Sequence, residues 1–123
     1  MATVLVVEDE EALRQLVVML LQNKGHDVLQ ACNGLEGLMV YSSYRTRLDL
    51  VLTDIDMPQM NGLVLATRIR ALDPARKILF MSGRPPENPD ELGNCRLLTK
   101  PFRPDQLMAA VEDVMKGQAE PVG

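Results

Sequence analysis

The stretch DLVLTDIDMPQMNG, residues 49–62, decides the fold class because it joins a buried strand to a pair of carboxylates. A strand is predicted over 48–53, and its run of apolar residues is typical of a central strand in a parallel sheet. The run ends abruptly at Asp54, and Asp56 follows two positions later. An unpaired charge at the end of a central strand is costly, so we expect Asp54 to have partners there. The Asn-Gly pair that follows predicts a turn into a helix.

The composition places the chain among globular proteins and excludes several function classes. Its 123 residues suit one domain, predicted over 1–118, with 119–123 as a tail or linker stub. The net charge of −4, without a basic run, argues against direct binding of nucleic acid. No apolar run approaches the roughly 20 residues of a membrane span, and no signal peptide is evident. We therefore expect a cytoplasmic protein that does not bind membranes.

Short β-branched runs alternate with amphipathic stretches along the whole chain. This alternation predicts an α/β fold, in which helices cover both faces of a parallel five-stranded sheet. Three prolines crowd the segment between Ser82 and Lys100, so the fourth helix should be short or missing. The predicted strands are 3–7, 27–30, 48–53, 77–82 and 95–99.

Several local signals set the predicted helix ends and faces. Asn33 with Glu36 is a capping-box pattern that opens a helix to about Tyr44. Pro104 is expected at the first position of the last helix. Glycines close the first and last helices at positions 25 and 117. The expected apolar faces are Leu13, Leu16, Val17 and Leu20 in the first helix, and Leu63, Ala66, Ile69 and Leu72 in the third.

Polar residues stand at the carboxyl end of four predicted strands, where open parallel sheets form their sites. Glu8 and Asp9 follow the first strand and Asp54 ends the third. If the strand order is 2-1-3-4-5, these three carboxylates meet at one edge, and Ser82 and Lys100 approach from the other side. Three carboxylates without nearby His or Cys favour Mg²⁺. A phosphoryl group is the natural substrate, with Asp54 as nucleophile.

Each of these residues taken alone also has an ordinary explanation. Glu8 and Asp9 suit the positive end of a helix dipole, and Ser82 suits a turn before glycine. Lys100 could be a solvated lysine. Their joint occurrence at strand ends favours a site.

Four stretches carry a resemblance to a known family. VLVVEDEEALR, DLVLTDIDMPQMNG, ILFMSG and LLTKPF resemble the receiver domain of response regulators in bacterial two-component signalling, over about residues 3–116. The resemblance implies a flavodoxin-like, doubly wound (βα)5 fold. It also implies a phosphoprotein that takes a phosphoryl group from a phosphohistidine of a histidine kinase or a histidine phosphotransfer protein, and then changes its binding to a downstream protein.

The resemblance assigns roles to the acidic residues. Asp54 would be the phospho-acceptor. Glu8 and Asp9 would be the acidic pair for Mg²⁺, with Asp9 as a direct ligand and Glu8 acting through water. Asp56 would offer its backbone carbonyl to the metal, and its side chain would not be a second catalytic acid.

The resemblance also assigns the opposite side of the site. Ser82 would be the switch hydroxyl and Lys100 the lysine of the family, followed by a peptide to Pro101 that is commonly cis. Leu97 departs from the pattern, because the family usually has an aromatic switch residue there. Together with the shortened fourth helix, this predicts a monomer or weak dimer that does not use the usual dimer face.

Two receiver hypotheses stay open, and two other classes fit worse. The domain is either a switch that controls a partner or a phosphorelay receiver of a hybrid histidine kinase, and neither is a conventional enzyme. A haloacid dehalogenase-like phosphatase would carry Asp-x-Asp on its first strand and its acidic pair late, whereas the order here is reversed. A flavin-binding flavodoxin would need a Ser/Thr/Gly-rich phosphate loop after the first strand, where this chain has EDEEALR.

Overall fold

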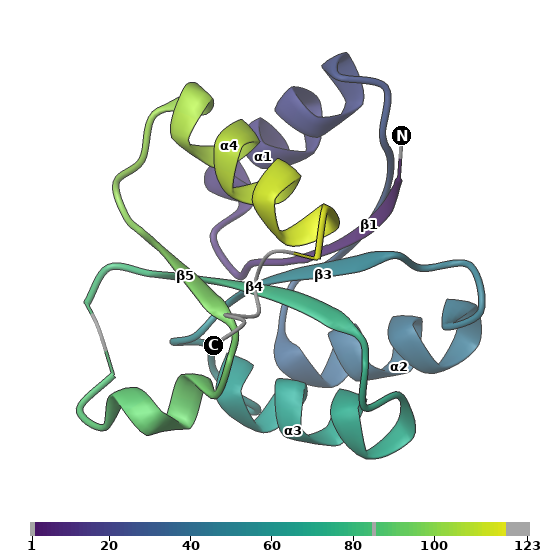
Figure 1. Cartoon of the computed structure of the whole chain (residues 1–123), viewed down its shortest axis with the longest axis vertical. Helices are drawn as coiled ribbons and strands as arrows, with labels where there is room; N and C mark the ends of the chain where they lie inside the picture. The colour runs from purple at the N-terminus through teal and green to yellow at the C-terminus, as the bar shows by residue number, and fades with distance from the viewer. Residues whose placement is uncertain (1, 85, 118–123) are drawn as a thin grey trace.

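The computed structural model describes residues 2–84 and 86–117, which form one parallel sheet with helices on both faces (Figure 1). Its five strands lie in the order β2-β1-β3-β4-β5. The predicted α/β class and the strand order 2-1-3-4-5 are therefore confirmed. The strands are β1 (Thr3–Val7), β2 (Asp27–Ala31), β3 (Leu50–Asp54), β4 (Lys77–Ser82) and β5 (Arg96–Thr99).

Helices of the described residues cover both faces of the sheet, two on each face (Figure 1). Helices α1 (Glu11–Asn23) and α4 (Pro104–Met115) pack on one face, and α2 (Gly34–Tyr44) and α3 (Gly62–Leu72) pack on the other. Each pair closes its own apolar cluster against the sheet. All five residues of β3 are buried, as expected for a central strand that is covered on both faces.

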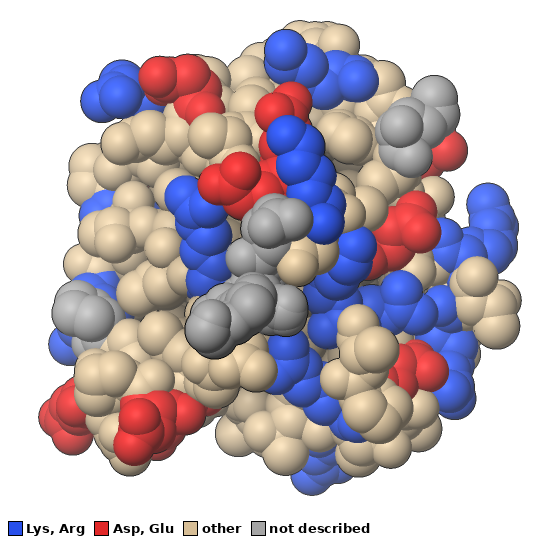
Figure 2. Space-filling view, in the orientation of Figure 1, with Lys and Arg blue, Asp and Glu red and all other residues tan. Residues whose placement is uncertain are grey.

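The connection between β4 and β5 lacks a full helix in its described part. It carries a short 3₁₀ helix, η1 (Pro89–Leu92), capped by the Asn88 side chain, which accepts a hydrogen bond of 3.0 Å from the Asp90 N–H. The prediction of a short or missing fourth helix is confirmed, because proline cannot continue a helix interior. The labels α1–α4 consequently skip this connection. Figure 2 shows acidic side chains gathered at the lower left, over the η1 segment of Figure 1.

The predicted helix ends are largely confirmed. The Asn33 side chain accepts a hydrogen bond of 2.8 Å from the Glu36 N–H, and α4 begins at Pro104. The Glu36 carboxylate reaches one residue further back than a standard capping box, because it accepts from the Cys32 N–H at 2.6 Å. Gly25 follows α1 with φ at +93°, a left-handed conformation that glycine adopts without strain.

The predicted apolar faces are only partly right. In α1 the buried residues are Val17, Val18 and Leu21, and Leu16 is 44% exposed. In α3 the outer residue Leu72 is 42% exposed. Both helices contain more apolar residues than the sheet can cover, so spacing alone could not show which stripe faces inward.

Three remaining expectations concern single features. His26, expected at the surface without a role, is half-buried, and its Nδ1 accepts a hydrogen bond of 3.1 Å from the Ala2 N–H. The predicted boundary at residue 118 and the tail 119–123 lie outside the described residues. Within the described ranges, no helix is both long enough and apolar enough to cross a membrane.

Candidate functional site

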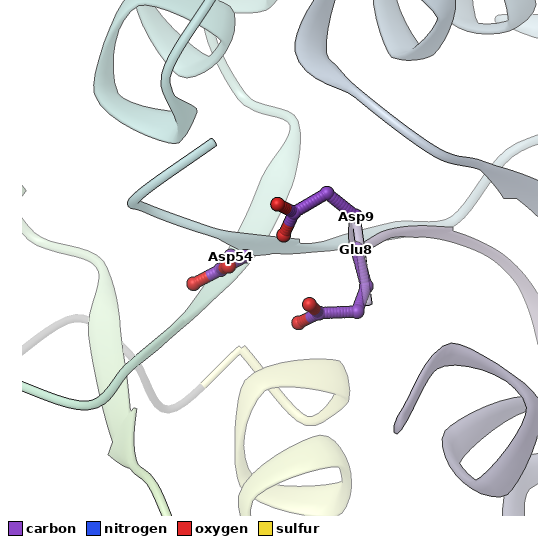
Figure 3. A group of neighbouring side chains, drawn as sticks. All are labelled: Glu8, Asp9 and Asp54. Atoms are coloured by element: carbon purple, nitrogen blue, oxygen red, sulfur yellow. The ribbon is translucent and has the colours of Figure 1, made fainter. Parts of the chain in front are cut away.

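The carboxyl ends of β1 and β3 bring three carboxylates together, as the sequence predicted. Parallel pairing sets Val7 beside Thr53, so the next residues of the two strands are neighbours. Glu8, Asp9 and Asp54 each offer an oxygen atom, and these oxygens all lie within 4.8 Å of one another. Figure 3 shows Glu8 and Asp9 reaching from the end of β1 toward Asp54 on the end of β3. The three side chains could share one cation.

Two of these carboxylates are almost inaccessible to water. Glu8 is 1% exposed and Asp54 is 4% exposed, whereas Asp9 is exposed. Burial raises the pKa of Asp54 above its ordinary value, and the nearby charge of Asp9 adds to this. Burial likewise raises the pKa of Glu8, with a further contribution from the charge of Asp54. The arrangement is therefore unfavourable for full ionisation without a positive charge among the oxygens.

Lys100 supplies a positive charge from the other side of the site. Its Nζ donates to Oε1 of Glu8 at 2.9 Å and lies 3.3 Å from Oδ2 of Asp54. Burial alone would lower the pKa of Lys100, but its hydrogen bond to Glu8 and the charges of both carboxylates raise it overall. The peptide that follows, Lys100–Pro101, is cis, as the resemblance implied.

Ser82 and Asp56 lie at the edge of the site with partners of their own. Ser82 is buried at the end of β4, and its hydroxyl donates to the carbonyl of Arg84 and accepts from the Arg84 N–H at 3.1 Å. Asp56 is exposed, and its Oδ2 lies 3.8 Å from Nε of Arg84. The side chains that the structure brings close together are thus the three carboxylates and Lys100, whereas Ser82 makes its hydrogen bonds to Arg84.

Leu97 occupies the predicted switch position on β5. It pairs in register with Phe80 on β4 and is half-buried against the apolar cluster under α2 and α3. A leucine cannot hydrogen-bond at its end as a tyrosine would. The site therefore has no aromatic residue at this position to move together with Ser82.

Two residues near the site were not singled out from the sequence. Gly62 was taken as a turn residue, but a Cβ atom there would lie 2.1 Å from the backbone oxygen of Asp54. Arg14 on α1 donates a hydrogen bond of 2.9 Å to the backbone oxygen of Glu8. The Asn-Gly pair offered a signal for Gly62, because glycine also permits close backbone approach. Arg14 carried no such signal.

Comparison of the sequence with protein families matches residues 4–112 to the response regulator receiver domain. The chain belongs to the response regulator receiver family. It is accordingly a phosphoryl-acceptor signalling domain with the flavodoxin-like receiver fold, and not a conventional enzyme. The phosphatase and flavin-binding alternatives are set aside.

Individual relatives differ in how much more chain they contain. Sensor kinase CckA of Brucella abortus is 35% identical over 121 residues, which cover 95% of this chain and 13% of the kinase. Aerobic respiration control protein ArcA of Escherichia coli is 32% identical over 116 residues, which cover 91% of this chain and 48% of ArcA. The chain thus spans less than half the length of either relative.

Solved structures give the same picture of the fold. The receiver domain of the hybrid histidine kinase CckA superimposes with a TM-score of 0.80 at 29% identity, covering 92% of this chain and 98% of that domain. Response regulator TrrA of Thermotoga maritima, in complex with Mg²⁺ and BeF, gives 0.84 at 32% identity, covering 93% and 99%.

Proposed function

We propose that Asp54 accepts a phosphoryl group from a phosphohistidine of a histidine kinase or a histidine phosphotransfer protein. The carrying observation is that Asp54 is a buried carboxylate on the central strand, beside two further carboxylates and 3.3 Å from Nζ of Lys100. An oxygen of Asp54 would bond to phosphorus as the P–N bond of the donor breaks. The donor imidazole keeps the electron pair and takes up a proton. The transfer is catalysed by the domain itself.

The acidic group fits Mg²⁺ by its chemistry. Hard carboxylate oxygens without His or Cys among them suit this ion, and burial makes their mutual repulsion expensive without a cation. In this proposal Asp9 is a direct ligand, Glu8 acts through water, and Asp54 and the backbone carbonyl of Asp56 complete the protein ligands. Bound Mg²⁺ would offset the charge on the phosphoryl oxygens. The Mg²⁺–BeF complex of TrrA supports this choice of ion.

Lys100 and Ser82 complete the proposed site. The Nζ atom of Lys100 already lies 3.3 Å from Oδ2 of Asp54, so its positive charge can offset the charge of a phosphoryl group attached to Asp54. The Ser82 hydroxyl must leave the backbone of Arg84 before it can donate to that group. Its movement would shift a two-state equilibrium and change how a downstream protein binds. Leu97 then acts as a packing residue on this face, without an aromatic partner movement.

A second candidate function is a phosphorelay receiver that passes its phosphoryl group to a histidine phosphotransfer protein. The similarity to sensor kinase CckA and to the receiver of hybrid kinase CckA favours it. Both candidates use the same acceptor, and both include a receiver domain over 1–118 in the cytoplasm, without direct contact to nucleic acid. They differ in whether the group leaves to a second histidine.

The test of the acceptor is direct phosphorylation. The domain is incubated with Mg²⁺ and a small phosphodonor, and intact mass spectrometry records one added phosphoryl group. Asp54→Asn should lose this mass increase, while Asp113→Asn, an exposed carboxylate paired with Arg96, should keep it. Equal labelling of Asp54→Asn would refute the assignment. Rapid loss of the group to an added histidine phosphotransfer protein would select the relay function.

A further inference from the structure

Exposed apolar side chains concentrate on one part of the molecule. Among the described residues, seven large apolar side chains are exposed, and five of them lie on α2 and α3. Single exposed apolar residues are ordinary, but a contiguous set marks an interaction surface. Those five are Leu35, Met39 and Tyr44 on α2 and Val64 and Leu72 on α3. We call Leu35, Leu38, Met39, Val64, Ala71 and Leu72 the α2–α3 surface.

The α2–α3 surface has a ridge beside a groove. The ridge consists of Leu35 and Met39, which stand one turn apart on the outer side of α2, and Met39 is 65% exposed. The groove runs between the two helices, and its lining combines three apolar with three polar residues. Its lining is Leu38, Ser42, Thr67, Arg68, Ala71 and Leu72. A flexible, apolar methionine side chain suits insertion into such a groove.

Opposite charges flank the two features. Gly37 faces the sheet and Leu38 lines the groove, so Glu36, on the other side of Gly37, lies away from α3. Glu36 is exposed, and one of its carboxylate oxygens accepts from the Cys32 N–H. Arg68 lies on α3 across the groove, and it forms no ion pair within the described part of the chain. The order across the surface is therefore Arg68, groove, ridge and Glu36. A copy turned by a two-fold axis presents the same order reversed, so groove meets ridge and Arg68 meets Glu36.

We propose that the α2–α3 surface joins two copies of this chain in a two-fold dimer, with the ridge of each copy in the groove of the other. The self-complementary order of shape and charge favours a second copy over an unrelated partner. The surface contains none of the site residues Glu8, Asp9, Asp54, Ser82 or Lys100. The dimer is therefore independent of phosphorylation and leaves the acceptor site open.

Sedimentation velocity over a wide range of protein concentration tests the proposal. The wild-type protein should show a concentration-dependent dimer. Met39→Glu should raise the dimer dissociation constant about tenfold or more, because it places a charge at a central contact. Met19→Glu is the matched control, since Met19 is 48% exposed on α1 and should leave the dimer intact. Both methionines are exposed, so both variants should fold.

Two variants of Arg68 test the proposed contact between Arg68 of one copy and Glu36 of the other. Arg68→Glu should weaken the dimer several-fold because it faces Glu36, whereas Arg68→Lys should retain it. A wild-type protein that stays monomeric overturns the proposal and leaves the surface to a segment of a longer chain or to another partner. A dimer that appears only on phosphorylation, or that Met39→Glu and Met19→Glu weaken equally, also overturns it.

Discussion

The two ends of the sheet hold their charged groups in opposite ways. At the carboxyl end, Glu8 and Asp54 are buried close to each other and to Asp9, and Lys100 is the cation that pairs with both of them among the described residues. Burial raises the pKa of both buried carboxyls, which means that their ionised forms are disfavoured. Keeping both carboxyls ionised is therefore costly in the protein alone.

At the amino end, a connected group of described residues pairs its charges and hydrogen-bonding groups with one another. The hydroxyl of the buried Tyr41 donates to Asp73, and Nε of Arg76 donates to the same hydroxyl at 2.8 Å. Arg45 pairs with Asp73 at 2.9 Å. The hydrogen bond from Tyr41, followed by that from Arg45, lowers the pKa of Asp73. The amino end therefore stabilises the fold, while the carboxyl end retains an energetic cost where phosphoryl chemistry is proposed.

The largest effect should follow from breaking the amino-end network. Arg76 donates to Tyr41, to the Leu48 carbonyl and to the Arg45 carbonyl, so it ties the end of α2 and the loop before β3 to the loop before β4. Arg76→Met leaves these buried acceptors without their donor and should lower the free energy of unfolding by about 2–4 kcal/mol. Urea unfolding followed by circular dichroism measures the change.

The control for this variant is another arginine that stands near a tyrosine. Arg47 lies over the ring of Tyr44 at 5.8 Å and is exposed, so Arg47→Met should change stability by less than about 0.5 kcal/mol. Equal losses in the two variants would show that the amino-end network does not secure the fold.

A smaller effect, of opposite sign, should come from Mg²⁺ at the carboxyl end. An ion that binds only the folded protein stabilises it by about 2.7 kcal/mol at a concentration one hundred times its dissociation constant. Thermal unfolding with and without Mg²⁺ measures this gain. Asp9→Asn should lose most of it without disturbing the fold, because Asp9 is exposed. Asp113→Asn should keep it, and an equal loss in both variants would argue against the acidic cluster as the metal site.

The carboxyl end could be predicted from sequence because it obeys a topological rule. Apolar runs identified the strands, and parallel order then brought Asp54, Glu8 and Lys100 to one edge. The amino-end network could not be predicted in this way. Tyr41 and Arg76 are 35 residues apart, and each resembles an ordinary surface residue when read alone.

Two other features were also hidden from the sequence, for reasons of packing. Leu16 matched the apolar spacing of α1, yet neighbouring residues face the sheet in its place. The contact of Gly62 with the backbone of Asp54 depends on how the loop folds back, and a one-dimensional pattern does not contain that information.

The smallest predicted effect is on the pH dependence of stability, which should differ in sign between the two ends of the sheet. Glu8 and Asp54 have raised pKa values in the folded state, so between their ordinary and folded pKa values the folded protein binds more protons than the unfolded chain. Without Mg²⁺, stability should therefore fall as pH rises through this range toward neutrality. Asp73 has the opposite effect, because its pKa is lowered: its contribution to stability is fully present above its ordinary pKa and is lost as pH falls through its lowered folded-state pKa. Urea unfolding at a series of pH values measures the two limbs of the stability profile, namely the decrease toward neutral pH and the decrease at acidic pH.

Substitution of Asp54, the proposed acceptor, should remove part of the decrease in stability toward neutral pH. Asp54→Asn removes one raised carboxyl and part of the repulsion on Glu8, so the fall in stability toward neutral pH should become shallower. The acidic limb should stay, because Asp73 lies at the other end of the sheet with Tyr41 and Arg45. Mg²⁺ should reverse the first limb in the wild-type protein, since its ligands bind only when deprotonated. A wild-type profile that rises steadily to neutral pH without metal would mean that the carboxyl end carries no such cost.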